Sequence, residues 1–160
     1  MSIAKRNPNT ILLHGPAIKW DANQGDAVGT YLASAAITPG WLIEIHDNSS
    51  VAAWRPHGTA SEQVSTAVAL DRPENNDTID TDFAIGDTVP AAWLSPGAVF
   101  YGVIPSGQDI SPGELLQSNG DGKLKVASAS TATANVAKFQ SLDLTGAVTA
   151  DTRLRVVVIQ

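Results

Sequence analysis

The residues of this chain that could do chemistry are three histidines, a run of acidic residues and scattered hydroxyl groups. The histidines are His14, His46 and His57, and no two of them have the i, i+2 or i, i+4 spacing of metal ligands on a strand or a helix. Asp47 follows His46, but adjacent residues on a strand face opposite sides, so it could not orient the imidazole. The spacing predicts no metal site and no catalytic triad, and leaves a metal site assembled from distant segments as an alternative.

The acidic segment Asp77–Asp82 is a candidate calcium-binding loop. An EF-hand loop needs oxygen ligands at positions 1, 3 and 5, glycine at position 6 and glutamate at position 12. Counted from Asp77, position 3 is Ile79 and position 12 is Thr88, so the motif fails. We expect a solvated acidic connection, with a cation site of another kind as the alternative.

Signals for nucleophilic catalysis and for cofactor binding are absent from the sequence. None of the 160 residues is cysteine, which excludes disulfides, thiolate nucleophiles and cysteine-based metal sites and fits folding in a reducing cytoplasm. No Gly-x-Ser-x-Gly elbow and no glycine-rich phosphate loop occurs. We therefore expect no catalytic residue, no cofactor and no enzymatic activity.

The charge balance narrows the class of partner. The net charge is −6, and the few basic residues are mostly scattered singly along the chain. Binding to nucleic acid or to an anionic membrane surface needs clustered lysine and arginine. No apolar run approaches the roughly 20 residues of a transmembrane helix. We therefore expect neither nucleic acid nor a membrane as partner.

Short strands are the elements available to position side chains. In Trp41–His46, alternation places Trp41, Ile43 and Ile45 on one face of a strand. Further strands are predicted at Ile11–His14, Val51–Trp54, Val64–Leu70, Ala98–Ile104, Leu124–Val126, Val136–Leu144 and Arg153–Ile159, the last with Leu154, Val156 and Val158 facing inward.

Helix signals are weak by comparison. The candidate Gln24–Ala36 contains two glycines, each of which costs about 1 kcal/mol relative to alanine inside a helix, and the candidate Thr59–Ala67 is short. Many short strands separated by glycine and proline predict an all-β domain, either a sandwich or a barrel.

Turn residues support the all-β prediction. Pro39-Gly40, Pro96-Gly97 and Pro112-Gly113 each suit a type II turn, in which proline fixes the first central φ and glycine accepts the positive φ that follows. Asn119–Gly122 separates two apolar runs and predicts a hairpin.

Two segments of the sequence also resemble each other. Ile37–Ile43 matches Ile110–Leu116 in pattern, and in both places a polar turn and a second short strand follow. We interpret this as one hairpin module used twice, with chance similarity between Pro-Gly turns as the alternative. The predicted organisation is an extended N-terminal arm over residues 1–36 and a β-domain of two similar halves over residues 37–160.

Candidate contact residues lie in the predicted arm and in a predicted connection. Trp20 falls in the arm and Trp93 in the connection before Pro96, and aromatic residues at such places are favoured anchors for partner chains. Lys5 and Arg6 place positive charge at the tip of an otherwise acidic protein. We expect these four residues to bind a partner; packing onto the chain's own domain is the alternative for the tryptophans, and stacking of tryptophan on sugar rings is another.

Over residues 37–160 the sequence resembles the capsid decoration, or cement, proteins of tailed bacteriophages. The shared features are Pro-Gly turns that lead into short strands, glycine-rich turns and a valine-rich final strand. They are carried by Ile37–Ile45, Ala84–Val89, Ala98–Ile104, Ile110–Val126 and Leu154–Ile159.

This resemblance implies a β-barrel or β-tulip-like domain with an extended arm. It also implies homotrimers on the outer surface of the capsid that bridge neighbouring major capsid protein subunits. Such a protein needs no catalytic residue, because binding only the assembled shell lowers the free energy of that state. The expected location is the virion, after synthesis in the host cytoplasm. A phage tail or fibre component is the main alternative, followed by a small trimeric β-barrel enzyme acting on nucleotides.

Overall fold

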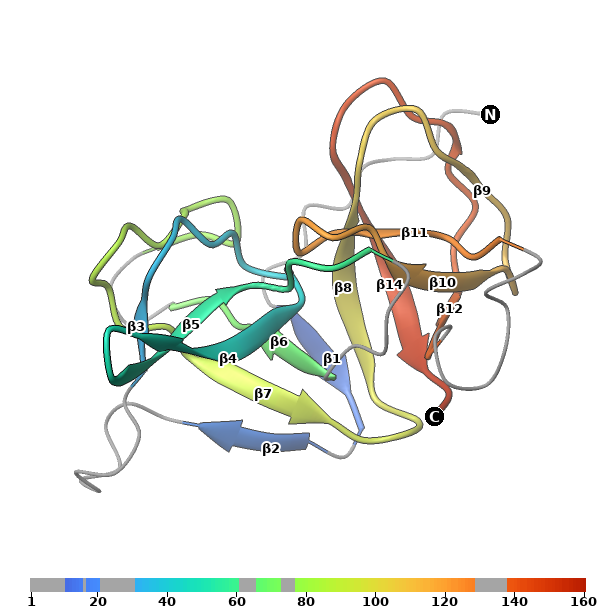
Figure 1. Cartoon of the computed structure of the whole chain (residues 1–160). Helices are drawn as coiled ribbons and strands as arrows, with labels where there is room; N and C mark the ends of the chain where they lie inside the picture. Colours follow the sequence, from blue (N-terminus) through green and yellow to red (C-terminus); the bar gives the residue numbers. More distant parts are fainter. Residues whose placement is uncertain (1–10, 16, 21–30, 61–65, 73–76, 129–137) are drawn as a thin grey trace.

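Short runs of β-branched and aromatic residues, interrupted by glycine and proline, fold as strands throughout the described part of the chain. The computed structural model describes residues 11–15, 17–20, 31–60, 66–72, 77–128 and 138–160. Within these residues the fold is all-β, with several sheets and no helix. Two groups of strands lie side by side (Figure 1), which we call lobe 1 (described residues of 17–94) and lobe 2 (residues 11–15 and the described residues of 98–160).

Lobe 1 contains two three-stranded sheets. The first has the order β3-β5-β4, in which β3 is parallel to β5 and β4 forms a hairpin with β5; the second has the order β2-β7-β6 and is antiparallel. The strands are β2 (Ala17–Trp20), β3 (Leu32–Ala33), β4 (Ile43–Asn48), β5 (Val51–Pro56), β6 (Ala67–Ala69) and β7 (Ala91–Leu94).

Lobe 2 is built on a six-stranded antiparallel sheet of order β1-β8-β14-β12-β10-β11 and a two-stranded sheet β13-β9. The strands are β1 (Leu12–His14), β8 (Val99–Ile104), β9 (Asp109–Ile110), β10 (Leu115–Ser118), β11 (Leu124–Val126), β12 (Phe139–Ser141), β13 (Gly146–Ala147) and β14 (Thr152–Val158). The sheet is open, because β1 and β11 are its edges and do not pair with each other. The observed architecture is therefore compatible with a sandwich and is not a closed barrel.

Two hydrophobic clusters form the core, and one of them crosses between the lobes. Trp54, Phe83 and their neighbours fill lobe 1. The larger cluster centres on Phe100 and Phe139 of lobe 2 and also takes in Leu42 and Val68 from lobe 1. Since separating the lobes would expose these apolar side chains to water, the shared cluster favours one fixed arrangement of the two.

A repeated pair of hydrogen bonds fixes the turns onto the sheets. At the turn that contains Gly40, the glycine N–H donates to the carbonyl of Ala69 (2.8 Å), and the N–H of Ala69 donates to the carbonyl of Trp41 (3.0 Å). We call this pair of hydrogen bonds a glycine clamp. It gives partners to backbone groups that lie outside regular sheet pairing, where an unpaired buried group would be costly.

The glycine clamp recurs at the second copy of the predicted module. The Gly113 N–H donates to Ser141 (2.8 Å), and the N–H of Ser141 donates to the carbonyl of Glu114 (2.9 Å). The two matching sequence segments therefore make the same contacts, each with the last residue of a short strand, β6 or β12. The same arrangement joins Gly86 to Ala33, Gly97 to Val158 and Gly107 to Val148, and all five glycines have φ between 86° and 91°.

Each predicted run contains a strand among its described residues, with ends that differ by a few positions, while the starts of the runs Val64–Leu70 and Val136–Leu144 lie outside the described part. Leu154, Val156 and Val158 are buried as expected, the Asn119–Gly122 hairpin joins β10 to β11, and glycine has positive φ in all three Pro-Gly turns. Neither helix candidate is helical where it is described, because the end of the first contains β3 and the end of the second leads into β6.

The predicted arm contributes strands to both lobes. β1 pairs with β8, β2 pairs with β7, and β3 pairs with β5. Ile11 is fully buried in the core that the two lobes share. The described residues of this segment are therefore integrated into the sheets, while residues 1–10 and 21–30 lie outside the described part.

Gly40 and Gly97 lie in equivalent turns. Comparing an alanine substitution at each position separates the cost of steric crowding from the cost of backbone strain. A Cβ added at Gly40 would lie 2.6 Å from the carbonyl oxygen of Tyr101 in lobe 2, whereas one added at Gly97 would meet nothing within 4 Å. We expect Gly97→Ala to cost about 1–2 kcal/mol, the penalty of a left-handed alanine. Gly40→Ala should cost clearly more, since it also pushes the lobes apart. Urea unfolding of both variants measures the difference, and equal losses would contradict this account of the lobe junction.

Candidate functional site

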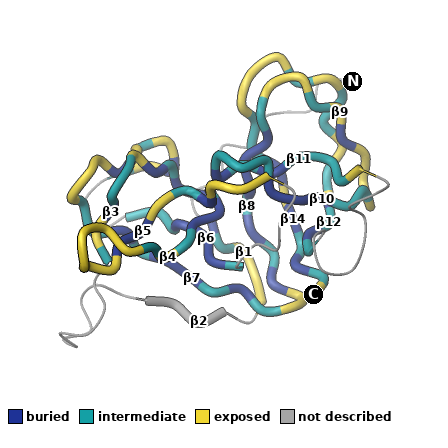
Figure 2. Tube along the Cα trace, viewed as in Figure 1, coloured by how far each residue is buried: buried dark blue, intermediate teal, exposed yellow. Residues whose placement is uncertain are grey.

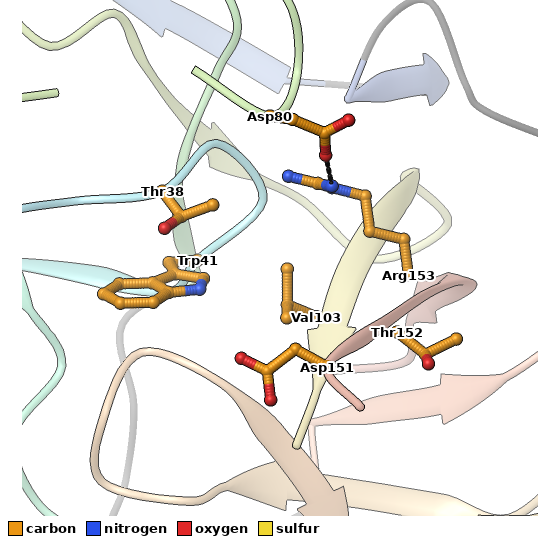
Figure 3. A pocket seen from close by; sticks show the side chains of 7 residues that line it. All are labelled: Thr38, Trp41, Asp80, Val103, Asp151, Thr152 and Arg153. Carbon is orange, nitrogen blue, oxygen red and sulfur yellow. Dashed lines mark hydrogen bonds and ion pairs between the residues drawn. The ribbon is translucent and has the colours of Figure 1, made fainter. Parts of the chain in front are cut away.

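A pocket of about 200 Å³ lies at the junction of the two lobes (Figure 3). Lobe 1 contributes its side chains from the turn before β4 and from the acidic segment, and lobe 2 contributes them from β8 and the start of β14. The lining residues are Thr38, Trp41, Asp80, Val103, Asp151, Thr152 and Arg153.

Arg153 forms one wall of the pocket and holds the lobes together. Its guanidinium pairs with the carboxylate of Asp80 and donates to the backbone carbonyls of Pro39 (3.2 Å) and Ile79. The side chain is only 16% exposed, and its Nε is buried without a hydrogen-bond partner in the described part of the chain. A guanidinium that serves three acceptors of lobe 1 from a strand of lobe 2 acts as a cross-link.

Lys123 lies beside the pocket and neutralises Asp151. Its Nζ is 2.9 Å from Asp151 and 3.5 Å from Asp121, and it lies 5.7 Å from the ring centroid of Trp41. Burial alone would lower the pKa of Lys123, but the hydrogen bonds and negative charges of the two aspartates outweigh burial and raise it above its usual value. The ammonium is therefore fully charged at neutral pH.

His57 is a second polar link between the lobes. Its side chain is buried at 4% exposure, with Nδ1 2.8 Å from the hydroxyl of Ser118 on β10 and Nε2 3.7 Å from Glu44 on β4. Its backbone accepts a hydrogen bond from the N–H of Gly122 (3.2 Å). These contacts join the end of β5 to the hairpin of lobe 2, so the geometry around His57 is that of a structural residue.

The other two histidines lie elsewhere. His14 is exposed on β1. On β4, Nε2 of His46 is 2.6 Å from the hydroxyl of Ser34, and that hydroxyl donates to the carbonyl of Trp54 (3.0 Å). With its proton committed to a carbonyl, the hydroxyl accepts from His46 and is not activated by it. No sequence motif indicated this pair of residues.

The acidic segment is folded back onto the chain. Asp77 pairs with Arg72 (2.9 Å), Asp80 pairs with Arg153, and Asp82 accepts a hydrogen bond from Thr38 (2.6 Å). The connection is solvated as expected at Asp80 and Asp82, which are exposed, and all three carboxylates also have partners within the protein. Across the described ranges, no three or more histidine, cysteine or acidic side chains are grouped as metal ligands would be.

The predicted partner-binding residues fall in different places. Lys5 and Arg6 lie outside the described residues. Trp20 ends β2, where its backbone pairs with Ala91. Trp93 was placed in a connection by the sequence, and that placement is wrong, because β7 is an internal strand flanked by β2 and β6. Its ring is half-buried, 5.3 Å from the ring of Trp54; contact with a partner stays a prediction for all four residues.

Three exposed apolar side chains that the sequence did not reveal lie on lobe 1. Leu32 is 46% exposed, Val51 66% and Ile85 74%. Leu32 and Val51 share the outer face of the β3-β5-β4 sheet, and Ile85 is at the tip of the turn that Gly86 clamps to Ala33. Figure 2 shows the exposed stretches along the β4-β5 hairpin and this turn. We call Leu32, Val51 and Ile85 the outer apolar face.

No protein-family model and no curated protein matches the sequence. Among solved structures, the fold is similar to the N base of the head fibre protein gp8.5 of bacteriophage phi29, with a TM-score of 0.55 and 10% sequence identity. The similarity covers 89% of this chain and 94% of that chain. At this identity it establishes a shared fold. In the described residues, no helix has the length and apolar character to cross a membrane.

Arg153 and Arg155 on the same strand provide a matched test of the lobe cross-link. Arg153→Ala leaves two backbone carbonyls and Asp80 without their donor, and we expect a loss of about 1–3 kcal/mol in the free energy of unfolding. Arg155 pairs with Asp143 within lobe 2 and is half exposed, so Arg155→Ala should cost less than about 1 kcal/mol. Chemical denaturation measures both, and an Arg153 variant no less stable than the Arg155 variant would contradict the cross-link.

The Asp143–Arg155 pair predicts a specific response to acid. Burial alone would raise the pKa of Asp143, but hydrogen bonds from the side chain and backbone of Arg155, and its charge, lower it below its usual value. This contribution to stability is present above the unfolded pKa and is lost as pH falls through the folded one. Unfolding of Asp143→Asn between pH 6 and 2 should show a weaker acid dependence than the wild type. Asp109→Asn, at an exposed site on β9, should keep the wild-type dependence; identical curves for all three proteins would refute the prediction.

Proposed function

We propose that this chain is a structural protein of a bacteriophage virion. It binds the outside of the assembled capsid, bridges neighbouring major capsid protein subunits and stabilises the shell. The observation that carries the proposal is the fold similarity to a phage head fibre base, which extends over nearly the whole of both chains. The sequence features shared with capsid decoration proteins support it from a separate direction.

The chemistry of the described residues agrees with a binding role. The polar side chains that could do chemistry, including Arg153, His57 and the acidic segment, are engaged in contacts within the chain. A protein that binds only the assembled shell stabilises it by mass action, and the many equivalent sites on a capsid multiply the effect. We also propose a homotrimer, because a trimer engages several capsid subunits at once and gains avidity.

The outer apolar face is the surface we propose for contact with the capsid protein. Exposed leucine, valine and isoleucine side chains favour burial against a partner. The charged pair on the same sheet, Glu44 and Arg55, is closed on itself at 2.7 Å, so little desolvation of unpaired charge opposes binding. Lys5, Arg6 and Trp20 are proposed to add contacts.

A component of a head fibre or tail is the second candidate, because the structural neighbour is named as a head fibre. The two proposed functions differ in the location of the protein on the virion and in the shape of its assembly. A decoration protein covers the head as compact trimers. A fibre component would form an elongated assembly with strands intertwined between chains.

The capsid proposal predicts a gain in shell stability. Purified protein mixed with undecorated shells of the phage that encodes it should co-sediment with them and raise the temperature at which they rupture. Light scattering of the free protein should give three times the chain mass. Absence of both co-sedimentation and a shift in rupture temperature would refute the proposal.

Variants that introduce negative charge test which surface of the protein binds the shell. Lys5→Glu combined with Arg6→Glu should weaken shell binding without changing the unfolding temperature, and Ile85→Asp should do the same through the outer apolar face. Lys138→Glu, which reverses a charge on lobe 2, away from the outer apolar face, is the control and should bind like the wild type.

A further inference from the structure

The junction pocket presents hydrogen-bonding groups that the described part of the chain leaves unused. Asp80 and Asp151 each engage a cation through one carboxylate oxygen, Oδ1 with Arg153 and Oδ2 with Lys123, so that each carboxylate has a second oxygen available. Both aspartates are about half exposed. In Figure 3 the indole nitrogen of Trp41 lies at the edge of the ring that faces Val103 and Asp151. The Trp41 N–H and the Asp151 carboxylate therefore offer a donor and an acceptor around one small volume, whereas the second oxygen of Asp80 points away from both (Figure 3).

The charges around the pocket select against ionic ligands. An anion would meet two carboxylates in half-exposed positions, and like charges repel at this range. A metal ion at the free carboxylate oxygens would lie beside the guanidinium of Arg153 and the ammonium of Lys123, and like charges repel at this range. A purely apolar ligand would bury the indole N–H and the carboxylate oxygens without partners, which is costly. A neutral ligand with several hydroxyl groups satisfies all of them, because each hydroxyl both donates and accepts.

The size and rigidity of the pocket favour one sugar ring. Its volume of about 200 Å³ is below the roughly 300–1,000 Å³ of sites for drug-sized ligands. Trp41 is fixed in place, because Gly122 packs so closely on its ring that an added Cβ would lie 3.0 Å from it. In Figure 3 the ring turns the edge that carries its nitrogen toward the other lining residues, so Trp41 contributes this edge and its N–H to a ligand.

We propose that this pocket binds a neutral monosaccharide unit, with Asp151 accepting from its hydroxyls and the Trp41 indole donating to one of its oxygens. The inference goes beyond the proposed structural role and does not depend on it, since the pocket lies within a single chain. It identifies a saccharide-binding activity for a protein whose outer apolar face, on a different part of lobe 1, is left to a protein partner.

The test follows the indole N–H of Trp41 by ¹H–¹⁵N NMR on the full chain. The probes are the methyl glycosides of glucose, galactose, mannose and N-acetylglucosamine, up to about 50 mM, because a single sugar ring in a small pocket binds with millimolar affinity or weaker. Trp41→Phe assigns the signal. At least one neutral glycoside should shift it along a saturable curve, while methyl glucuronide and glucosamine, the charged counterparts, should not.

Two variants decide whether the pocket itself is responsible. Asp151→Asn loses one acceptor oxygen and its pairing with Lys123, and should weaken the binding of the same glycoside about five-fold or more, as one lost charge-assisted hydrogen bond predicts. Asp109→Asn, outside the pocket lining, should bind like the wild type, and thermal unfolding shows that both are folded. The proposal is overturned if no neutral glycoside shifts the Trp41 signal, if Asp151→Asn binds unchanged, or if the charged probes bind equally well. None of these results bears on capsid binding, which is measured separately with purified shells.

Discussion

Pairing of the backbone groups at the turns is the constraint on which this fold depends. Most strands are short, so regular sheet pairing leaves many N–H and C=O groups near the core without partners. The glycine clamp meets that need in two hydrogen bonds, with Gly40 and Ala69 in lobe 1 and Gly113 and Ser141 in lobe 2 as the repeated pair.

Two polar links and one shared core turn the lobes into a single unit. Arg153 reaches across to Asp80 and two carbonyls, His57 is held between β5 and β10, and Leu42 and Val68 pack into the core of lobe 2. The fixed relation of the lobes gives the junction pocket its shape. The outer apolar face lies apart from this junction, on the β3-β5-β4 sheet and the turn that contains Gly86.

Much of the fold was predictable because its signals are local. Pro-Gly turns and alternating strands depend on residues within about ten positions of each other, and these predictions hold. β7 was missed because Ala91 and Ala92 carry little strand preference and become a strand through pairing with β2 and β6. The pocket and the Arg153–Asp80 pair could not be predicted, since they join residues 73 positions apart, and the outer apolar face depends on which side of a sheet is covered.

Placement on the virion is the central claim, and it can be measured directly. Antibodies raised against the purified chain, coupled to gold and applied to intact, nuclease-treated particles of the encoding phage, should label the outside of the head at many positions per particle. Label confined to the tail would favour a fibre or tail component. Particles that contain none of the chain by mass spectrometry, with all of it left in the soluble lysate, would contradict a structural role in the virion.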